Sequence, residues 1–151
     1  TGGFAAGYLS DYVFQSRRAP PVAILNFTML ALMVVMSAVL FSSPIVIGFC
    51  AIMMQFSVIG VHSLMSGTAA ADFGGRKATA TASGIVDGFV YLGSGIQSIS
   101  LGFLVSKNWQ FWPLFLLPFT AIGCILALRI WKELPLATKK YIDNVETADS
   151  P

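Results

Sequence analysis

A run of 53 consecutive residues, 19–71, contains no Asp, Glu, Lys or Arg. As one continuous helix this run would be about 80 Å long, more than twice the roughly 30 Å hydrocarbon core of a bilayer. The run must therefore cross the membrane and fold back, and we expect the reversal at Ser42-Ser43-Pro44 because proline interrupts one helix and starts the next. Only 11% of the 151 residues are charged, which is too few to form the surface of a soluble domain of this size. It is predicted to be an integral membrane protein.

The hydropathy pattern predicts an all-α, polytopic membrane fold with four complete transmembrane helices. These helices are expected over about 21–41, 44–66, 78–105 and 111–131. Residues 1–20 are expected to hold the end of an earlier helix and a loop, and residues 132–151 a polar tail outside the bilayer. Because the chain opens at Thr1 inside an apolar stretch and without a Met, we expect it to be part of a longer protein.

Basic residues gather on one predicted side of the membrane. That side carries Arg17, Arg18, Arg76, Lys77, Arg129, Lys132, Lys139 and Lys140, and the opposite side carries Lys107. Short loops rich in Lys and Arg stay in the cytoplasm. We therefore expect both chain ends and the loop 67–77 to face the cytoplasm.

Asp87 is a carboxylate in the middle of the apolar span 78–105, with no Lys or Arg within nine residues. A charge at the centre of a membrane helix costs about 2.5–3.5 kcal/mol, so Asp87 must be neutral, paired or facing water. Tyr91 lies one turn away on the same face. Beside this face runs a predicted seam for close helix packing, formed by Gly84, Gly88, Gly95 and Gly102. A structural partner for Asp87 and a role in proton or substrate coupling are both compatible with this pattern.

The span 44–66 carries a polar stripe. Gln55, His62 and Ser66 lie within about 20° of one face of an ideal helix. Such a stripe faces either a packed neighbouring helix or a transport pathway, and the sequence allows both. A single His predicts no metal site, and no cofactor is expected.

The segment "GYLSDYVFQSRR" combines Gly7 with charges of both signs, at Asp11, Arg17 and Arg18. At a membrane boundary these charges predict either an ordinary positive-inside loop or a network that one conformation makes and another breaks. Their spacing resembles the loop signature of the major facilitator superfamily, which lies between helices 2 and 3 and again between helices 8 and 9. If this is the second copy, the chain runs from the end of helix 8 to helix 12 of a twelve-helix bundle.

A more specific resemblance lies in "IGVHSLMSGTAAADFGGRKATATASGIVDGFVYLGSG". This segment resembles the helix 10 to helix 11 region of the organophosphate:phosphate antiporter family, which includes glycerol-phosphate and sugar-phosphate transporters. The matching features are the pair Gly60 and His62, the basic pair Arg76 and Lys77, and the "GIVDG" element at 84–88.

The resemblance implies exchange of a phosphorylated organic solute for inorganic phosphate, by rocking two six-helix halves around a central site. The N-terminal half of the same transporter would be the partner of this chain. The family's phosphate-binding arginines lie on helices 1 and 7, outside this chain, so no residue here is assigned to phosphate. Asp87, on helix 11, is then expected to link packing to conformational change.

Two other functions fit the same residues. One is a transporter-like membrane sensor that binds a sugar phosphate without carrying flux. The other is a proton-driven carrier of another solute, with Asp87 as the proton carrier. An enzyme is not expected, because the chain contains no nucleophile elbow, no phosphate-binding loop and no His-Glu-x-x-His motif. Nucleic acid is not expected as a partner, because the basic residues are spread along one membrane face.

Overall fold

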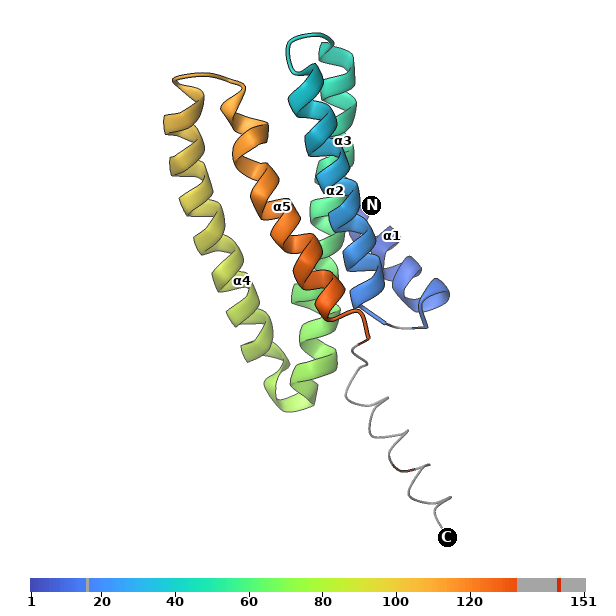
Figure 1. Ribbon diagram of the computed structural model, residues 1–151. Coiled ribbons are helices and arrows are strands. Elements are labelled where there is room, and N and C mark those ends of the chain that lie inside the picture. The colour runs from blue at the N-terminus through green and yellow to red at the C-terminus, as the bar shows by residue number, and fades with distance from the viewer. Residues whose placement is uncertain (16, 133–143, 145–151) are drawn as a thin grey trace.

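The computed structural model describes residues 1–15, 17–132 and 144 and shows an all-α bundle (Figure 1). In chain order the elements are α1 (Gly2–Tyr8), η1 (Leu9–Val13), α2 (Ala19–Val39), α3 (Pro44–His62), η2 (Ser63–Ala69), α4 (Ala70–Val105) and α5 (Phe111–Arg129). The η segments are π-helices, whose backbone hydrogen bonds span five residues instead of four. The prediction of an all-α polytopic membrane fold is confirmed. Of the predicted tail, all but residues 132 and 144 lie outside the described residues.

Four stretches of helix are long and apolar enough to span a membrane. They are Ala19–Val39, Pro44–Asp72, Lys77–Val105 and Phe111–Arg129. The reversal before the second stretch is local in origin. Ser43 is extended, with φ −149° and ψ 102°, and Pro44 begins α3 where a missing backbone N–H costs nothing. α2 likewise has prolines in its first turn.

The segment 67–77, predicted to be a loop, is mostly helical. α3 runs directly into η2, and helix continues past Ala69 until the chain reverses at Gly75. Gly75 has φ 59° and ψ −173°, a conformation that side-chain-bearing residues rarely adopt. A Cβ on Gly74 would lie 3.0 Å from the backbone nitrogen of Thr79, so the two arms of the reversal are close. The chain therefore reverses at a single glycine, whereas the sequence predicts a loop over 67–77.

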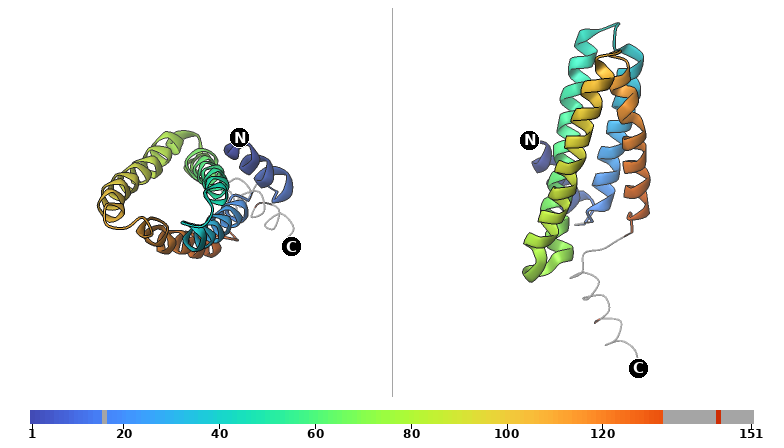
Figure 2. Two further views of the ribbon diagram at one scale, coloured as in Figure 1. Left: turned by 90° about the horizontal axis from the view of Figure 1, so that it is seen from above. Right: turned by 90° about the vertical axis from the view of Figure 1, so that its left-hand side faces the viewer.

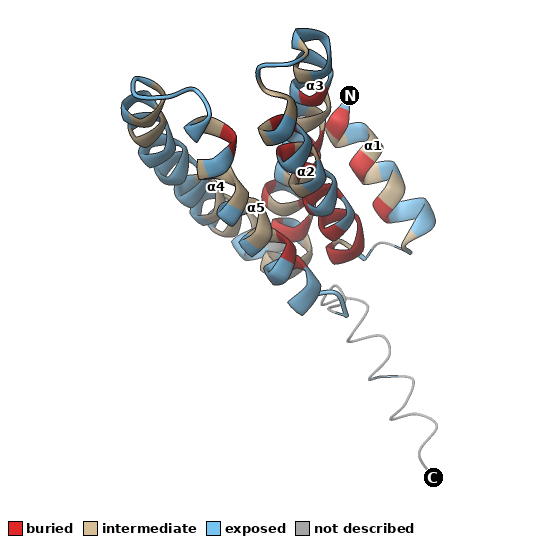
Figure 3. Ribbon diagram, turned by 45° about the horizontal axis from the view of Figure 1, so that its top comes forward, coloured by how far each residue is buried: buried red, intermediate tan, exposed pale blue. Residues whose placement is uncertain are grey.

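α2 lies at the centre of the packed part of the bundle, between α3 and α5. Small residues allow the helices to approach closely. A Cβ on Gly60 of α3 would lie 2.8 Å from Leu25 Cδ1, and a Cβ on Gly123 of α5 would lie 2.6 Å from Asn26 Oδ1. Asn26 is buried, and its side-chain nitrogen donates to the Val22 carbonyl at 2.9 Å. Buried residues gather where α1, α2 and α3 meet (Figure 3).

α4 stands apart from this packed region, on the far side of the bundle from α1 (Figure 2). None of the apolar window of its span is buried. Added Cβ atoms would meet nothing within 4 Å at any glycine of the span, which are Gly84, Gly88, Gly93, Gly95 and Gly102. The predicted packing seam is therefore unoccupied by the described residues, and its use by a helix outside this chain stays a prediction.

The segments predicted to lie on one side of the membrane share one end of the bundle. Arg17 and Arg18, the reversal at 72–77 and the end of α5 lie at one end, and the turns at 40–43 and 106–110 lie at the other (Figure 1). The first end carries Arg17, Arg18, Lys77 and Arg129, whereas the second carries Lys107. The assignment of the basic end to the cytoplasm stays a prediction.

Candidate functional site

The first polar site is the Arg18 cluster, which comprises Ser10, Asp11, Arg18 and Asp72. Arg18 Nε donates to Asp72 Oδ2 at 2.7 Å, and its Nη1 donates to Asp11 Oδ1 at 2.5 Å and to Ser10 Oγ at 2.9 Å. The Arg18 side chain is only 13% exposed. One guanidinium thus joins η1, the start of α2 and the first turn of α4.

Two opposing effects set the charge of Arg18. Burial lowers its pKa, but hydrogen bonds and charge attraction from Asp72 and Asp11 outweigh burial, so the pKa of Arg18 is raised above its ordinary value. Arg18 is therefore positive at every physiological pH. A cation flanked by two carboxylates is held as a hydrogen-bonded network rather than as a single ion pair.

Of the two basic residues in the predicted loop network, Arg18 pairs with Asp11. Arg17 is exposed, and its backbone carbonyl accepts a hydrogen bond from Ser10 Oγ at 3.2 Å. A Cβ on Gly7 would meet nothing within 4 Å, so no described residue packs closely against this glycine. Asp72 was missed, although an acidic residue at the same predicted boundary was a usable signal.

The second polar site is the Asp87 cluster, which comprises His62, Ser66, Ser83 and Asp87. Ser66 Oγ donates to Asp87 Oδ1 at 2.5 Å and lies 3.2 Å from Ser83 Oγ. His62 Nε2 lies 3.8 Å from Asp87 Oδ1, which is within ion-pair range but too long for a hydrogen bond. Ser66 is buried, and the side chains of His62 and Asp87 are partly exposed. The Asp87 carboxylate is therefore hydrogen-bonded by Ser66 of η2 and lies within ion-pair range of His62 of α3.

The π-helix η2 changes how the predicted polar stripe is used. It begins directly after His62, so the 100° step of an ideal α-helix no longer relates Gln55 to Ser66. Ser66 and His62 both reach Asp87, whereas Gln55 is exposed on α3. Tyr91 is 70% exposed, and no hydrogen bond or ion pair joins it to the Asp87 cluster among the described residues. The structure thus joins two of the three stripe residues to Asp87.

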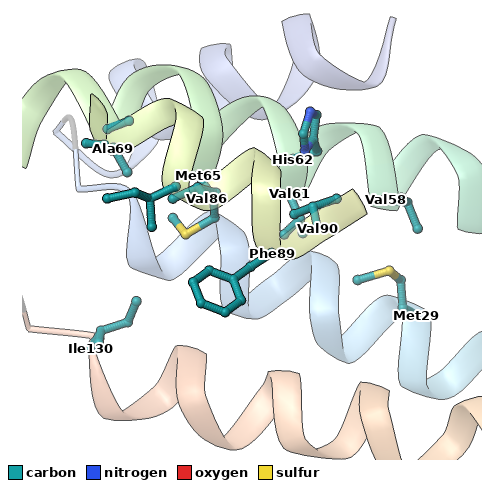
Figure 4. Close-up of a pocket in the computed structure, with 13 residues that line it drawn as sticks. Met29, Val58, Val61, His62, Met65, Ala69, Val86, Phe89, Val90 and Ile130 are labelled. Carbon is teal, nitrogen blue, oxygen red and sulfur yellow. The ribbon is translucent and has the colours of Figure 1, made fainter. Parts of the chain in front are cut away.

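An apolar groove of about 750 Å³ opens beside the Asp87 cluster. Its walls come from α2, α3, η2, α4 and the residue that follows α5, as Met29, Phe89 and Ile130 illustrate (Figure 4). Twelve of its lining residues are apolar, and His62 is the thirteenth. Phosphate needs positive charge or hydrogen-bond donors, so this groove alone does not make an organic-phosphate site.

No group of three or more His, Cys, Asp or Glu side chains that could hold a metal ion occurs among the residues that the structure describes. Apart from Asp72, Lys77 and Arg129 at the ends of the described spans, the ionisable groups within them are His62 and Asp87, together with two buried cysteines and the exposed Tyr91. Two sets of polar contacts therefore connect α4 to the other elements: the Arg18 cluster at one end of the bundle and the Asp87 cluster in the middle.

Comparison with known proteins identifies a relative that is a transporter. The chain is 30% identical over 146 residues to the glycerol-3-phosphate transporter of Bacillus subtilis (strain 168). The alignment covers 95% of this chain and 32% of that protein. The chain thus spans about a third of the length of this relative. No protein-family model matches it, and no solved structure gives a significant match.

The relative and the four spans together support an integral membrane protein. A transporter relative also favours a non-enzymatic role. The alignment with this relative extends across nearly the whole chain.

Proposed function

We propose that the chain is the C-terminal part of a major facilitator transporter that exchanges a sugar phosphate or glycerol phosphate for inorganic phosphate. The similarity to a glycerol-3-phosphate transporter over 95% of the chain is the observation that carries this proposal. The organophosphate:phosphate antiporter signature in the segment 59–95 points to the same solutes. The N-terminal half of the same protein would complete the bundle in the lipid bilayer, with both ends of this chain in the cytoplasm.

Alternating access requires contacts that form in one state and break in another. The Arg18 cluster joins α4 to the segment before α2, and the Asp87 cluster joins α4 to α3 and η2. α4 otherwise packs little against the rest of the chain. We assign to these residues a gating role, in which α4 separates from or approaches its neighbours, rather than direct contact with the phosphate group.

The glycines Gly84, Gly88, Gly95 and Gly102 fit the same proposal. They leave one face of α4 without side chains and without described neighbours. A helix of the N-terminal half could approach this face closely in one conformation and leave it in the other.

The test uses the full-length protein in liposomes loaded with inorganic phosphate. Uptake of labelled phosphate should require phosphate inside, and glycerol 3-phosphate or a sugar phosphate should compete with it. Binding of an organic phosphate without any exchange would instead identify a sensor. Uptake of a different solute driven by a pH gradient, with no phosphate exchange, would identify a proton-driven carrier and would contradict the proposal.

A further inference from the structure

The two ionisable side chains of the Asp87 cluster meet at the middle of the membrane. His62 lies ten residues before Asp72, the end of its span, and Asp87 lies ten residues after Lys77, the start of the next. Ten helical residues extend about 15 Å, half of a roughly 30 Å hydrocarbon core. Ionisable residues at this depth usually belong to a pathway for ions, protons or substrate.

We propose that His62 and Asp87 form a site that holds one proton at the middle of the membrane, and that this proton is released and rebound during transport. With the proton on the imidazole, the pair carries +1 on His62 and −1 on Asp87, a net charge of zero. When the proton leaves to water in the transport pathway, the pair carries −1 on Asp87. The use of the site in transport rests on the proposed phosphate exchange, whereas the shared proton does not.

The geometry provides both states of this site. Asp87 Oδ1 accepts a hydrogen bond from Ser66 at 2.5 Å, which supports the carboxylate form, and His62 Nε2 stands 3.8 Å away without being bonded to it. A small approach of α3 to α4 would bring His62 into hydrogen-bond range, and a small separation would release it. The His62 and Asp87 side chains are 43% and 35% exposed, so the described helices do not enclose the pair.

No other described charge forms an ion pair with either residue. The other titratable and charged groups with described side chains on α3, α4 and the elements around them are Tyr8 of α1, Asp11 and Tyr12 of η1, Arg18 at the start of α2, Cys50 of α3, Asp72, Lys77 and Tyr91 of α4, and Cys124 and Arg129 of α5. α2 itself carries no ionisable side chain, and Arg18 is engaged by Asp11 and Asp72.

A −1 charge at this depth would repel an anionic substrate, and little water is present to screen it. Phosphate exchange should therefore be faster when the pair holds its proton. This links the site to the proposed substrates through charge alone, without requiring His62 or Asp87 to touch the phosphate.

The first test compares phosphate exchange by the full-length protein in liposomes at about pH 6.5 and about pH 8.5, which bracket the higher part of the range where histidine changes charge. Phosphate itself titrates in this range, but equally for every variant. The exchange rate at the lower pH divided by the rate at the higher pH is expected to be about tenfold larger in the wild type than in Asp87→Asn or His62→Gln. The double variant should give the same ratio as the single variants. Asp87→Glu, which keeps a carboxylate, should restore much of the ratio.

Ser98→Ala is the matched control on α4. Ser98 is exposed and bonds to its own helix at the Ser94 carbonyl, so this variant should keep the wild-type ratio. A wild-type ratio in Asp87→Asn or in His62→Gln would overturn the proposal. A purely structural role for the pair would lower the rate at both pH values by the same factor, and that outcome would also overturn it.

A second measurement does not depend on transport. Infrared difference spectra of the purified full-length protein between the same two pH values, with the His62→Gln spectrum subtracted, isolate the His62 ring. The imidazolium signal should be present at the lower pH in the wild type and absent in Asp87→Asn. If it persists in Asp87→Asn, the two residues do not share a proton. If the signal behaves as expected but no phosphate exchange occurs at either pH, the proposed function fails and the proton site stands.

Discussion

α2 and α4 are both apolar helices of membrane-spanning length, yet they are held in the bundle in opposite ways. In α2, 39% of the most apolar window is buried against neighbouring helices, whereas none of the corresponding window of α4 is buried. α2 packs through methionines and through close approaches at small residues. α4 is held mainly by polar contacts at Asp72 and Asp87.

This difference separates a fixed element from a movable one. Packed side chains lose many small contacts at once when they separate, so a packed helix resists displacement. A hydrogen bond or ion pair, by contrast, can be exchanged for water or for another partner at small net cost. Among the described helices, α4 is therefore the one that packing holds least, which suits the gating role proposed for it.

Both polar connections depend on a π-helical segment. η1 contributes Ser10 and Asp11 to the Arg18 cluster, and η2 contributes Ser66 to the Asp87 cluster. π-helical turns are rare and often occur at functional sites, where the extra residue redirects side chains. The packed helices α2 and α5 contain no π-helical segment over their described lengths.

The largest effect is expected from enlarging a glycine in the packed region. Gly60→Leu places side-chain atoms where Leu25 and Ala6 already lie, so we expect a loss of about 3 kcal/mol in folding stability. The measurement is the thermal stability and yield of the full-length protein in detergent. Gly48→Leu is the control on the same helix, since a Cβ there meets nothing within 4 Å. Equal damage from both variants would contradict the packing described for α3.

The next largest effect is expected at the end of the bundle that carries the Arg18 cluster. Arg18→Gln leaves Asp11 and Asp72 without their shared cation, and we expect a loss of about 2 kcal/mol, below that of a fully buried pair because Asp11 is half exposed. Arg17→Gln, the adjacent control, should change stability by less than about 0.5 kcal/mol. Thermal denaturation of the full-length protein measures both.

The raised pKa of Arg18 also predicts how this loss depends on pH. A cation whose pKa is higher in the folded state contributes stability fully below its unfolded pKa, and loses it only as the pH rises through the folded pKa; for an arginine both lie far above neutral pH. The stability difference between wild type and Arg18→Gln should therefore stay constant between about pH 7 and about pH 9. A difference that shrinks across this range would show that another group supplies the charge.

A smaller, kinetic effect is expected at the second connection of α4. At about pH 6.5, where the proposed proton keeps the wild-type pair neutral, Asp87→Asn should slow phosphate exchange about tenfold while changing substrate affinity little, because the residue is assigned to gating rather than to phosphate binding. Exchange rates in liposomes and phosphate binding to the purified protein measure the two quantities. An unchanged exchange rate would remove Asp87 from the gating role, and an equal loss of affinity would place it in the substrate site.

The smallest effect is expected at the reversal before α4. Gly75→Ala puts a side chain at φ 59°, so we expect a loss of about 1 kcal/mol. Gly67→Ala, in η2, is the control because a Cβ there meets nothing within 4 Å and its φ is negative. If both variants are equally stable, the reversal does not depend on the left-handed glycine.

Much of the fold followed from local patterns. The uncharged stretch 19–71 required two membrane crossings, and Pro44 marked the start of the second. The segment 67–77 was misjudged because glycines and polar residues predict a loop, whereas here helix continues until Gly75. Local patterns indicate where a helix can end, but neighbouring helices decide how far it continues.

The sequence by itself determined that this chain spans a membrane and that a carboxylate at position 87 is energetically costly there. It also determined that charges of both signs gather at one membrane boundary. Only the tertiary structure decided the partners. Arg18 joins Asp72 across 54 residues, and Ser66 reaches Asp87 through a π-helical turn. These pairings depend on the rotation of each helix and on the distance between helices. Neither quantity is contained in the spacing of residues along the chain.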